Sequence, residues 1–190
     1  IGIAAAVYEG GSLLPDQTLI LGPGAGQALA GRAAPVAEHL QRGGCLLAIG
    51  MDQQEAQTLL PFPVTMRRAE HIATFFEPFP PGSPLAGVGP ADTHNRDPRE
   101  MSLLTGGAMV AGDGVLGRSS NANLLFCQIV PWQFAEPKQA NLKRTHRRAS
   151  LVVTRLLANL GVAGATPLLE RFHQPVEASK PEQRWLTGFY

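Results

Sequence analysis

The sequence predicts an α/β fold with three layers, in which a parallel sheet carries helices on both faces. Short apolar runs alternate with stretches of helical periodicity, which is typical of strand–helix–strand units. The run Cys45–Ile49 holds no charged residue, as expected of a central strand covered on both sides. The length of 190 residues suits one domain. We therefore expect a single α/β domain over residues 1–165, followed by an extended tail or linker over 166–190.

Composition and charge exclude several classes of partner. Charged residues make up 16% of the chain, below the usual value of about 25%, and 21 glycines and 16 prolines indicate a globular, loop-rich protein. A net charge of +1 provides no overall field to attract nucleic acid or an anionic membrane. No apolar run approaches the length of about 18 residues that crosses a bilayer. We expect neither a nucleic-acid nor a membrane partner. Because the chain starts at Ile1 rather than Met, we also expect it to be a segment of a longer polypeptide.

The first half of the chain supplies three predicted strands and two predicted helices. Glycine-bounded apolar runs predict strands at Ile3–Tyr8, Gln17–Leu21 and Cys45–Ile49. Apolar residues at helical spacing predict a helix at Ala33–Gln41. After the third strand, Asp52 and Glu55 have the spacing of a capping box, so a second helix should begin there. Pro61 and Pro63 end that helix and lead into Val64–Met66.

The second half predicts a long insertion, a β-hairpin and a final helix. Six prolines between Glu77 and Gly107 predict an irregular insertion, and loops of this length are often functional or face a partner. Turn signals at Asp113–Gly114 and Ser119–Asn123 predict hairpin strands after it. A stripe of apolar residues predicts a helix from about Lys138 to Leu160, ended by Gly161, with His146 on its buried face.

Two cysteines carry little information about the redox compartment. Cys45 and Cys127 lie inside apolar runs, where a free cysteine usually behaves as a small buried hydrophobic residue. Two such residues do not form a disulfide framework. If the two runs are neighbouring strands the sulfur atoms could meet, so both redox states stay open.

The glycine-rich segment GPGAG at 22–26 has the composition of a phosphate-binding loop. Glycines that follow a strand let backbone N–H groups approach an anion at a helix N-terminus. A dinucleotide fingerprint needs G-x-G-x-x-G, and here Gln27 stands where the third glycine belongs. A Walker loop needs a lysine, which does not follow. We therefore interpret the segment as a connection between a strand and a helix.

The turn after the third strand has the pattern of a nucleophile elbow. Doubly wound α/β folds present a nucleophile on a sharp turn between a strand and a helix. The segment AIGMDQQ at 48–54 resembles the elbow of class I glutamine amidotransferase-like domains, G-I-C-x-G-x-Q, in which the cysteine is the nucleophile. Ala48, Ile49 and Gln54 match the first Gly, the Ile and the Gln of that pattern, and Gly50 stands at the cysteine.

The other two catalytic positions of that family are also changed. Its late strand is followed by Q-F-H-P-E, which supplies the catalytic His and Glu, and this chain has QIVPW at 128–132. Val130 replaces the His and Trp132 replaces the Glu. A cysteine amidase needs a nucleophile, a base and a group that orients the base. The resemblance thus implies a flavodoxin-like scaffold without catalytic residues.

A second resemblance covers most of the chain. The segments at 46–56, 71–78, 84–98, 122–134 and 147–162 look like the amidotransferase-like accessory domain of large bacterial glycoside hydrolases of the β-galactosidase type. This resemblance implies a non-catalytic domain that packs on the other domains of a parent hydrolase or mediates homo-oligomer contacts, with carbohydrate as a further potential ligand. It implies no cofactor, and a periplasmic or extracellular location if the parent is exported.

Any ligand pocket should lie where the carboxyl ends of the strands meet. Open α/β sheets bind ligands at that edge, where residues 22–27, 50–53 and 131–133 should converge. The Pro-rich insertion is the expected rim. The candidate pocket residues are Gly24, Gly50, Met51, Asp52, Gln53, Asp92, His94, Arg96, Trp132 and Gln133.

Two alternatives to a non-catalytic domain remain open. One is a hydrolase or small-molecule-binding domain that uses Asp52, His71, Asp92 and His94 at the same edge of the sheet. Metal-ligand types also occur at Asp92, His94 and Asp97, with Glu70 and His71 upstream, but without a recognised ligand spacing, so we expect no metal site. The other is a binding module built on the final helix, which has six basic and no acidic residues between 138 and 160. A solvated basic face is the simpler interpretation of that helix.

Overall fold

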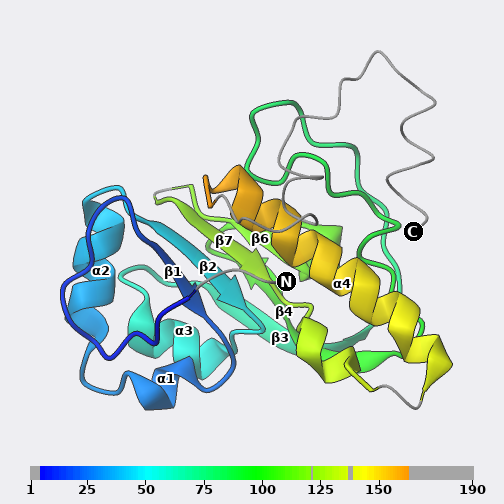
Figure 1. Cartoon of the computed structure of the whole chain (residues 1–190), viewed down its shortest axis with the longest axis horizontal. Helices are drawn as coiled ribbons and strands as arrows, with labels where there is room; N and C mark the ends of the chain where they lie inside the picture. Colours follow the sequence, from blue (N-terminus) through cyan, green and yellow to red (C-terminus); the bar gives the residue numbers. More distant parts are fainter. Residues whose placement is uncertain (1–4, 121, 137–138, 163–190) are drawn as a thin grey trace.

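The computed structural model describes residues 5–120, 122–136 and 139–162 and shows a mixed α/β fold (Figure 1). Its main sheet has five strands in the order β1-β2-β7-β6-β5, and β3 pairs with β4 in a separate two-stranded sheet. The strands are β1 Thr18–Leu21, β2 Cys45–Ile49, β3 Thr65–His71, β4 Arg99–Gly106, β5 Met109–Ala111, β6 Leu116–Arg118 and β7 Leu124–Cys127. The helices are α1 Ala25–Ala28, α2 Ala33–Gln41, α3 Gln53–Leu59 and α4 Ala140–Asn159, with short 3-10 turns η1 Gly112–Gly114 and η2 Pro131–Phe134.

The main sheet is parallel on one side and antiparallel on the other. β1, β2 and β7 run parallel, whereas β6 and β5 pair antiparallel to their neighbours. The sequence predicted a parallel sheet, and this difference has a topological reason. The chain reaches β7 through the antiparallel series β5, β6 and β7, so only β1 and β2 are joined by a helical crossover. The predicted β-hairpin in this part of the chain is confirmed.

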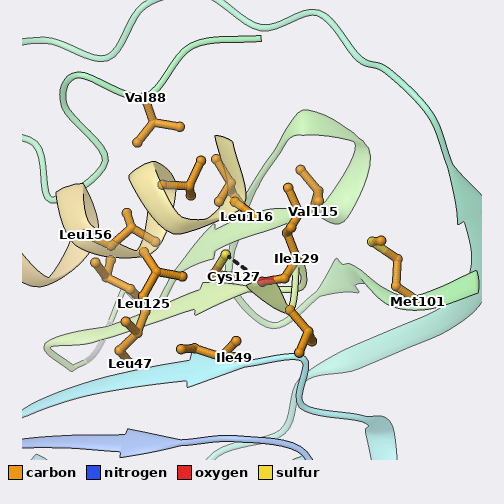
Figure 2. Packing of buried hydrophobic residues seen from close by; sticks show 14 of the residues in the cluster. Leu47, Ile49, Val88, Met101, Val115, Leu116, Leu125, Cys127, Ile129 and Leu156 are labelled. Atoms are coloured by element: carbon orange, nitrogen blue, oxygen red, sulfur yellow. Dashed lines mark hydrogen bonds between the residues drawn. The ribbon is translucent and has the colours of Figure 1, made fainter. Parts of the chain in front are cut away.

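Apolar side chains are buried on both faces of β2 and β7. Leu46 and Phe126 belong to one hydrophobic cluster, together with residues of α2 and α3. Leu47 and Leu125, which point to the opposite face because side chains alternate along a strand, pack with residues of α4 (Figure 2). The absence of charge from Cys45–Ile49 is thus explained, since β2 lies between two hydrophobic clusters.

Helix α4 is covered on its outer side by the Pro-rich insertion. The Nδ2 atom of Asn159 donates hydrogen bonds to the carbonyl oxygens of Pro84 and Ala86, both at 2.9 Å. Val88 packs on α4 from the side away from the sheet (Figure 2). His146 is only partly buried, whereas its neighbour Thr145 is buried, so the predicted place of His146 in the core is wrong.

Two other predictions are wrong because strand formation there depends on pairing between distant parts of the chain. Residues 5–8 of the predicted strand Ile3–Tyr8 form no strand, and no described strand pairs with the outer edge of β1; residues 1–4 lie outside the described residues. The predicted insertion Glu77–Gly107 contains β4, whose Met101 and Leu103 are buried against the core. Its partner β3 lies far upstream, so local sequence signals do not reveal the pair. The predicted tail at 166–190 also lies outside the described residues.

Cys45 and Cys127 are both free, although they lie on neighbouring strands. Cys127 is opposite Ile49, four residues along β2 from Cys45, which at about 3.3 Å per residue is beyond the reach of a disulfide. Burial raises the pKa of the Cys127 thiol to about 12, and its Sγ donates to the carbonyl oxygen of Ile129 (Figure 2). Cys127 is therefore an inert core residue.

Candidate functional site

The turns after β1, β2 and β7 converge at the carboxyl edge of the sheet. The N–H of Gly50 donates to the carbonyl oxygen of Cys127 at 2.8 Å, which ties the turn after β2 to the end of β7. A Cβ atom added to Gly22 would lie 3.6 Å from the ring of Trp132, so the loops after β1 and β7 are also in contact. The edge predicted to hold a pocket is therefore an assembled junction of three loops.

The carboxylate of Glu55 holds this edge together. Its Oε1 accepts hydrogen bonds from the N–H groups of Gly24 at 2.6 Å and Gly26 at 3.4 Å, and its Oε2 accepts from the N–H of Asp52 at 3.0 Å. The Asp52 carboxylate accepts in return from the N–H of Glu55 at 2.8 Å, so the predicted capping box is confirmed. We call residues 22–26 and 50–55, with Val130, the Glu55 junction.

The backbone amides of the GPGAG segment thus already face an anion supplied by the protein. Glu55 is 9% exposed, and a Cβ atom on Gly26 would lie 2.9 Å from its Cγ. The glycines are needed because a side chain of the chain itself approaches the loop. The sequence identified Glu55 through its local spacing to Asp52, but gave no sign of its contact with a loop about 30 residues upstream.

Other predicted pocket residues at this edge are also engaged in structural contacts. Met51 is buried in the core. The side-chain amide of Gln53 donates to the carbonyl oxygen of Val64 at 2.9 Å and accepts from the N–H of Met66 at 2.8 Å, which fixes α3 to β3. Trp132 and Gln133 remain exposed, with 55% of Trp132 accessible to solvent. This edge therefore offers mainly one indole ring to a ligand.

The remaining predicted residues, Asp92, His94 and Arg96, belong to a second group. They lie in the loop 89–97, which we call the His94 loop; Asp92 and His94 interact with basic residues of α4, and Arg96 acts on the charge of His94. The Nη1 of Arg148 is 3.4 Å from the Nδ1 of His94. Loss of solvation lowers the pKa of His94, and the charges of Arg148 and Arg96, with the neighbouring His71, lower it further.

Asp92 is the carboxylate of this second group. Its Oδ2 accepts a hydrogen bond from the N–H of Gly89 at 2.8 Å. Burial raises the pKa of Asp92, and the Gly89 hydrogen bond and the charges of Arg148 and Arg155 oppose that rise. Burial lowers the pKa of Arg155, and Asp92 opposes that shift. Asp92 and Arg155 therefore lie near enough for each to act on the charge of the other.

The four residues of the alternative catalytic constellation are not all brought together. Asp52 makes no hydrogen bond or ion pair with His71, Asp92 or His94. His71 is buried, with its Nε2 2.9 Å from the carbonyl oxygen of Thr93. Within the described parts of the chain, no group of three or more His, Cys, Asp or Glu side chains is arranged to hold a metal ion.

Two cavities lie away from the predicted site. One of about 380 Å³ is bordered by Arg67, Glu70 and Asp113, between the β3–β4 pair and η1. Another of about 180 Å³ lies beside Cys45 and Asn123, at the opposite end of β2 from the Glu55 junction. None of the ten predicted pocket residues lines either cavity.

Comparisons with known proteins give no relative: no family model, no curated protein and no solved structure matches this chain. Among the described residues, no helix has the length and apolar character needed to span a membrane. Function therefore has to be argued from the geometry of the site itself.

Proposed function

We propose that this chain is a non-catalytic accessory or interaction domain of a larger bacterial carbohydrate-active protein, a glycoside hydrolase by its sequence resemblance. We further propose that it has the three-layer, flavodoxin-like architecture of class I glutamine amidotransferase relatives. The observation that carries the proposal is the packing around Gly50. This glycine stands at the position of the family's nucleophile, at the end of a central strand and before a helix.

Gly50 keeps the backbone shape of a nucleophile elbow but has no room for a side chain. Its φ of +61° is the left-handed conformation of a sharp strand-to-helix turn, which glycine adopts without strain and other residues do not. A Cβ atom there would lie 2.3 Å from Cγ2 of Val130 and 3.2 Å from the ring of Pro23. Val130 stands at the position of the family's base. Its side chain therefore fills the space that a nucleophile side chain at position 50 would need. This packing favours a scaffold in which the former catalytic positions contribute to packing and not to catalysis.

An interaction role is supported by exposed apolar side chains at the free edge of the main sheet. β5 is the edge strand, and its Met109 and Val110 are 51% and 39% exposed. Ile72 and Phe75 are also exposed, and the segment that contains them runs beside Gly112 at the end of β5. An edge strand with apolar side chains is a surface that proteins usually cover with another chain or domain. We infer that the parent polypeptide or a second copy packs here.

The proposal is tested in the parent protein, by comparing the full chain with a Val110→Glu variant and a variant lacking this domain. We expect hydrolase kcat to change less than twofold, while light scattering or thermal unfolding shows a loss of assembly or of domain packing. Gln57→Glu, an exposed substitution on α3, is the matched control for the added charge. Hydrolysis of glutamine or of a nitrophenyl glycoside by this chain alone would contradict the proposal.

A second candidate function is carbohydrate binding at Trp132. The indole ring is half exposed beside Gly22, and such a ring can stack on a sugar face. The chain has one other tryptophan, Trp185, so the variant Trp185→Phe isolates the fluorescence of Trp132. Saturable quenching by galacto-oligosaccharides, abolished in Trp132→Ala by isothermal calorimetry, is the expected result. Unchanged fluorescence at millimolar sugar would exclude this function.

A further inference from the structure

The larger of the two cavities, of about 380 Å³, lies between the β3–β4 pair and the turn η1, away from the Glu55 junction and the His94 loop. It is bordered by the charged residues Arg67, Glu70 and Asp113 and by the exposed apolar residues Ile72 and Val110. Its volume is within the range of about 300–1,000 Å³ that is usual for pockets that bind small molecules. This cavity is therefore a candidate site for a small ligand.

The three charged side chains at the cavity have no partner in the described parts of the chain. None of Arg67, Glu70 and Asp113 takes part there in an ion pair or a side-chain hydrogen bond. By contrast, the next residue on β3, Arg68, does not border the cavity and is paired with Glu100 at 3.3 Å. The cavity thus keeps one cationic and two anionic groups available.

The buried ring of His71 adds a hydrogen-bond acceptor. His71 also borders the cavity, and only 3% of it is exposed. Its Nε2 lies 2.9 Å from the carbonyl oxygen of Thr93, and because a carbonyl group only accepts, Nε2 carries the proton. In the neutral ring Nδ1 is then an acceptor, and it has no hydrogen-bond partner among the described residues. No described group of His, Asp and Glu side chains is arranged to hold a metal ion, so these acceptors suit an organic donor.

The turn η1 holds the backbone of Asp113 beside the cavity in an unusual conformation. With a φ of 55°, Asp113 is the only described residue other than glycine that is left-handed, and it stands between two left-handed glycines. A Cβ atom on Gly114 would clash with the carbonyl oxygen of Leu104 on β4. One on Gly112 would lie 3.2 Å from Cγ2 of Thr74. Close packing on two sides therefore fixes the turn, and a backbone outlier held in this way is typical of a binding site.

We propose that this cavity binds a small zwitterion with an ammonium group, a carboxylate group and an apolar chain, the chemistry of an apolar amino acid. Arg67 donates two parallel hydrogen bonds to the carboxylate of the ligand. The ammonium group donates to Glu70 and Asp113, with the histidine ring as a further acceptor. The apolar chain packs on the two exposed apolar residues of the rim.

Neither charged half of such a ligand fits the cavity alone. An amine without a carboxylate brings a positive charge beside Arg67, and a carboxylate without an amine faces Glu70 and Asp113. In the zwitterion each charge of the ligand has a partner of opposite sign. Ile72 and Val110 also belong to the apolar surface at the sheet edge, but this inference does not rest on the accessory role, because binding is measured on this chain alone.

The test is isothermal titration calorimetry of the full chain with L-leucine and with two analogues that each lack one charge. Isopentylamine lacks the carboxylate of leucine, and isocaproate lacks its ammonium group. We expect saturable binding of L-leucine. Each analogue should bind at least about tenfold more weakly, which is the usual effect of losing a hydrogen bond to a charged group.

Two variants assign the charges of the ligand to residues of the cavity. Arg67→Gln should weaken L-leucine binding by about tenfold and remove the preference for leucine over isopentylamine. Asp113→Asn keeps a residue type that tolerates the left-handed turn, and it should reduce the preference for leucine over isocaproate. Arg68→Gln removes the same charge from the neighbouring residue outside the cavity, so this control should change L-leucine binding less than twofold.

Three outcomes would overturn the proposal. They are the absence of saturable L-leucine binding at millimolar concentrations, analogues that bind as tightly as L-leucine, and equal losses in Arg67→Gln and Arg68→Gln, which would indicate a general charge effect. If Asp113→Asn does not fold, Glu70→Gln supplies the same comparison, because Glu70 is exposed on β3.

Discussion

The Glu55 junction and the His94 loop each combine one carboxylate with backbone N–H groups of a loop, yet the two regions differ in what remains unsatisfied. Glu55 accepts three N–H groups and Asp52 completes the capping box. Asp92 accepts one N–H group and lies among arginines that outnumber it. The glycine-rich loop, which has the composition of a ligand site, is therefore structural. In the Pro-rich loop, by contrast, the carboxylate of Asp92 is influenced by more than one arginine.

The largest expected effect is at Gly50. Gly50→Cys places a cysteine where the proposed amidotransferase resemblance has its nucleophile, but its Cβ would meet Val130 and its backbone would stay left-handed. Overpacking and a left-handed side chain together should lower the free energy of unfolding by about 3 kcal/mol in urea denaturation. Adding Val130→Ala removes the clashing methyl group, so the double variant should be more stable than the sum of the two single changes. An unchanged free energy of unfolding in Gly50→Cys would show that the turn has room for a side chain at position 50.

The next effect is at Glu55. Glu55→Gln keeps the shape of the side chain but replaces one acceptor oxygen with a donor, so one of its N–H partners loses its hydrogen bond. Loss of a charged, largely buried acceptor should lower the free energy of unfolding by about 2 kcal/mol. The control is Glu38→Gln on the exposed face of α2, where the effect should stay below about 0.5 kcal/mol. Equal losses of stability in Glu55→Gln and Glu38→Gln would show that the contacts of Glu55 stabilise the fold no more than an exposed ion pair does.

The sequence predicts most of what is local in this molecule. The helix Ala33–Gln41 and the strand Cys45–Ile49 have their predicted bounds, because periodicity and flanking glycines act within a few residues. The capping box of Asp52 and Glu55 is equally local. The strand β4 was missed because prolines and charges surround its three buried apolar residues, and its pairing with β3 joins Glu70 to Glu100 across 30 residues.

In the candidate sites, too, the contacts that the sequence did not predict are long-range ones. The ten predicted pocket residues belong to two groups because sequence order does not reveal that the insertion crosses the outer face of α4. Arg148 was predicted as part of a basic helix face, but its contact with His94 joins residues 54 positions apart. Glu55 was predicted as a cap, whereas its second set of contacts depends on the packing of α1 against α3. Long-range contacts therefore decide which polar residues remain available.

A smaller effect is expected when the charge of Arg148 is removed. Arg148→Gln should change the free energy of unfolding by no more than about 0.5 kcal/mol, since it removes both an attraction to Asp92 and a repulsion of a charged His94. Urea denaturation in low and high salt measures this change. The difference in the free energy of unfolding between the wild-type protein and Arg148→Gln should be smaller in high salt. A loss of about 2 kcal/mol would place Arg148 with Glu55 as a structural residue.

The smallest expected effect is a pH dependence at Asp92. Because burial raises its pKa, the folded protein holds the Asp92 proton more tightly than the unfolded chain does. The sign follows: ionised Asp92 lowers stability as the pH rises from the ordinary value of 3.8 through the raised pKa. Asp92→Asn can still accept the hydrogen bond of Gly89 and does not ionise. Relative to this variant, the wild-type protein should lose stability over that pH window in urea titrations. The opposite slope would mean that the hydrogen bond of Gly89 and the charges of Arg148 and Arg155 outweigh burial.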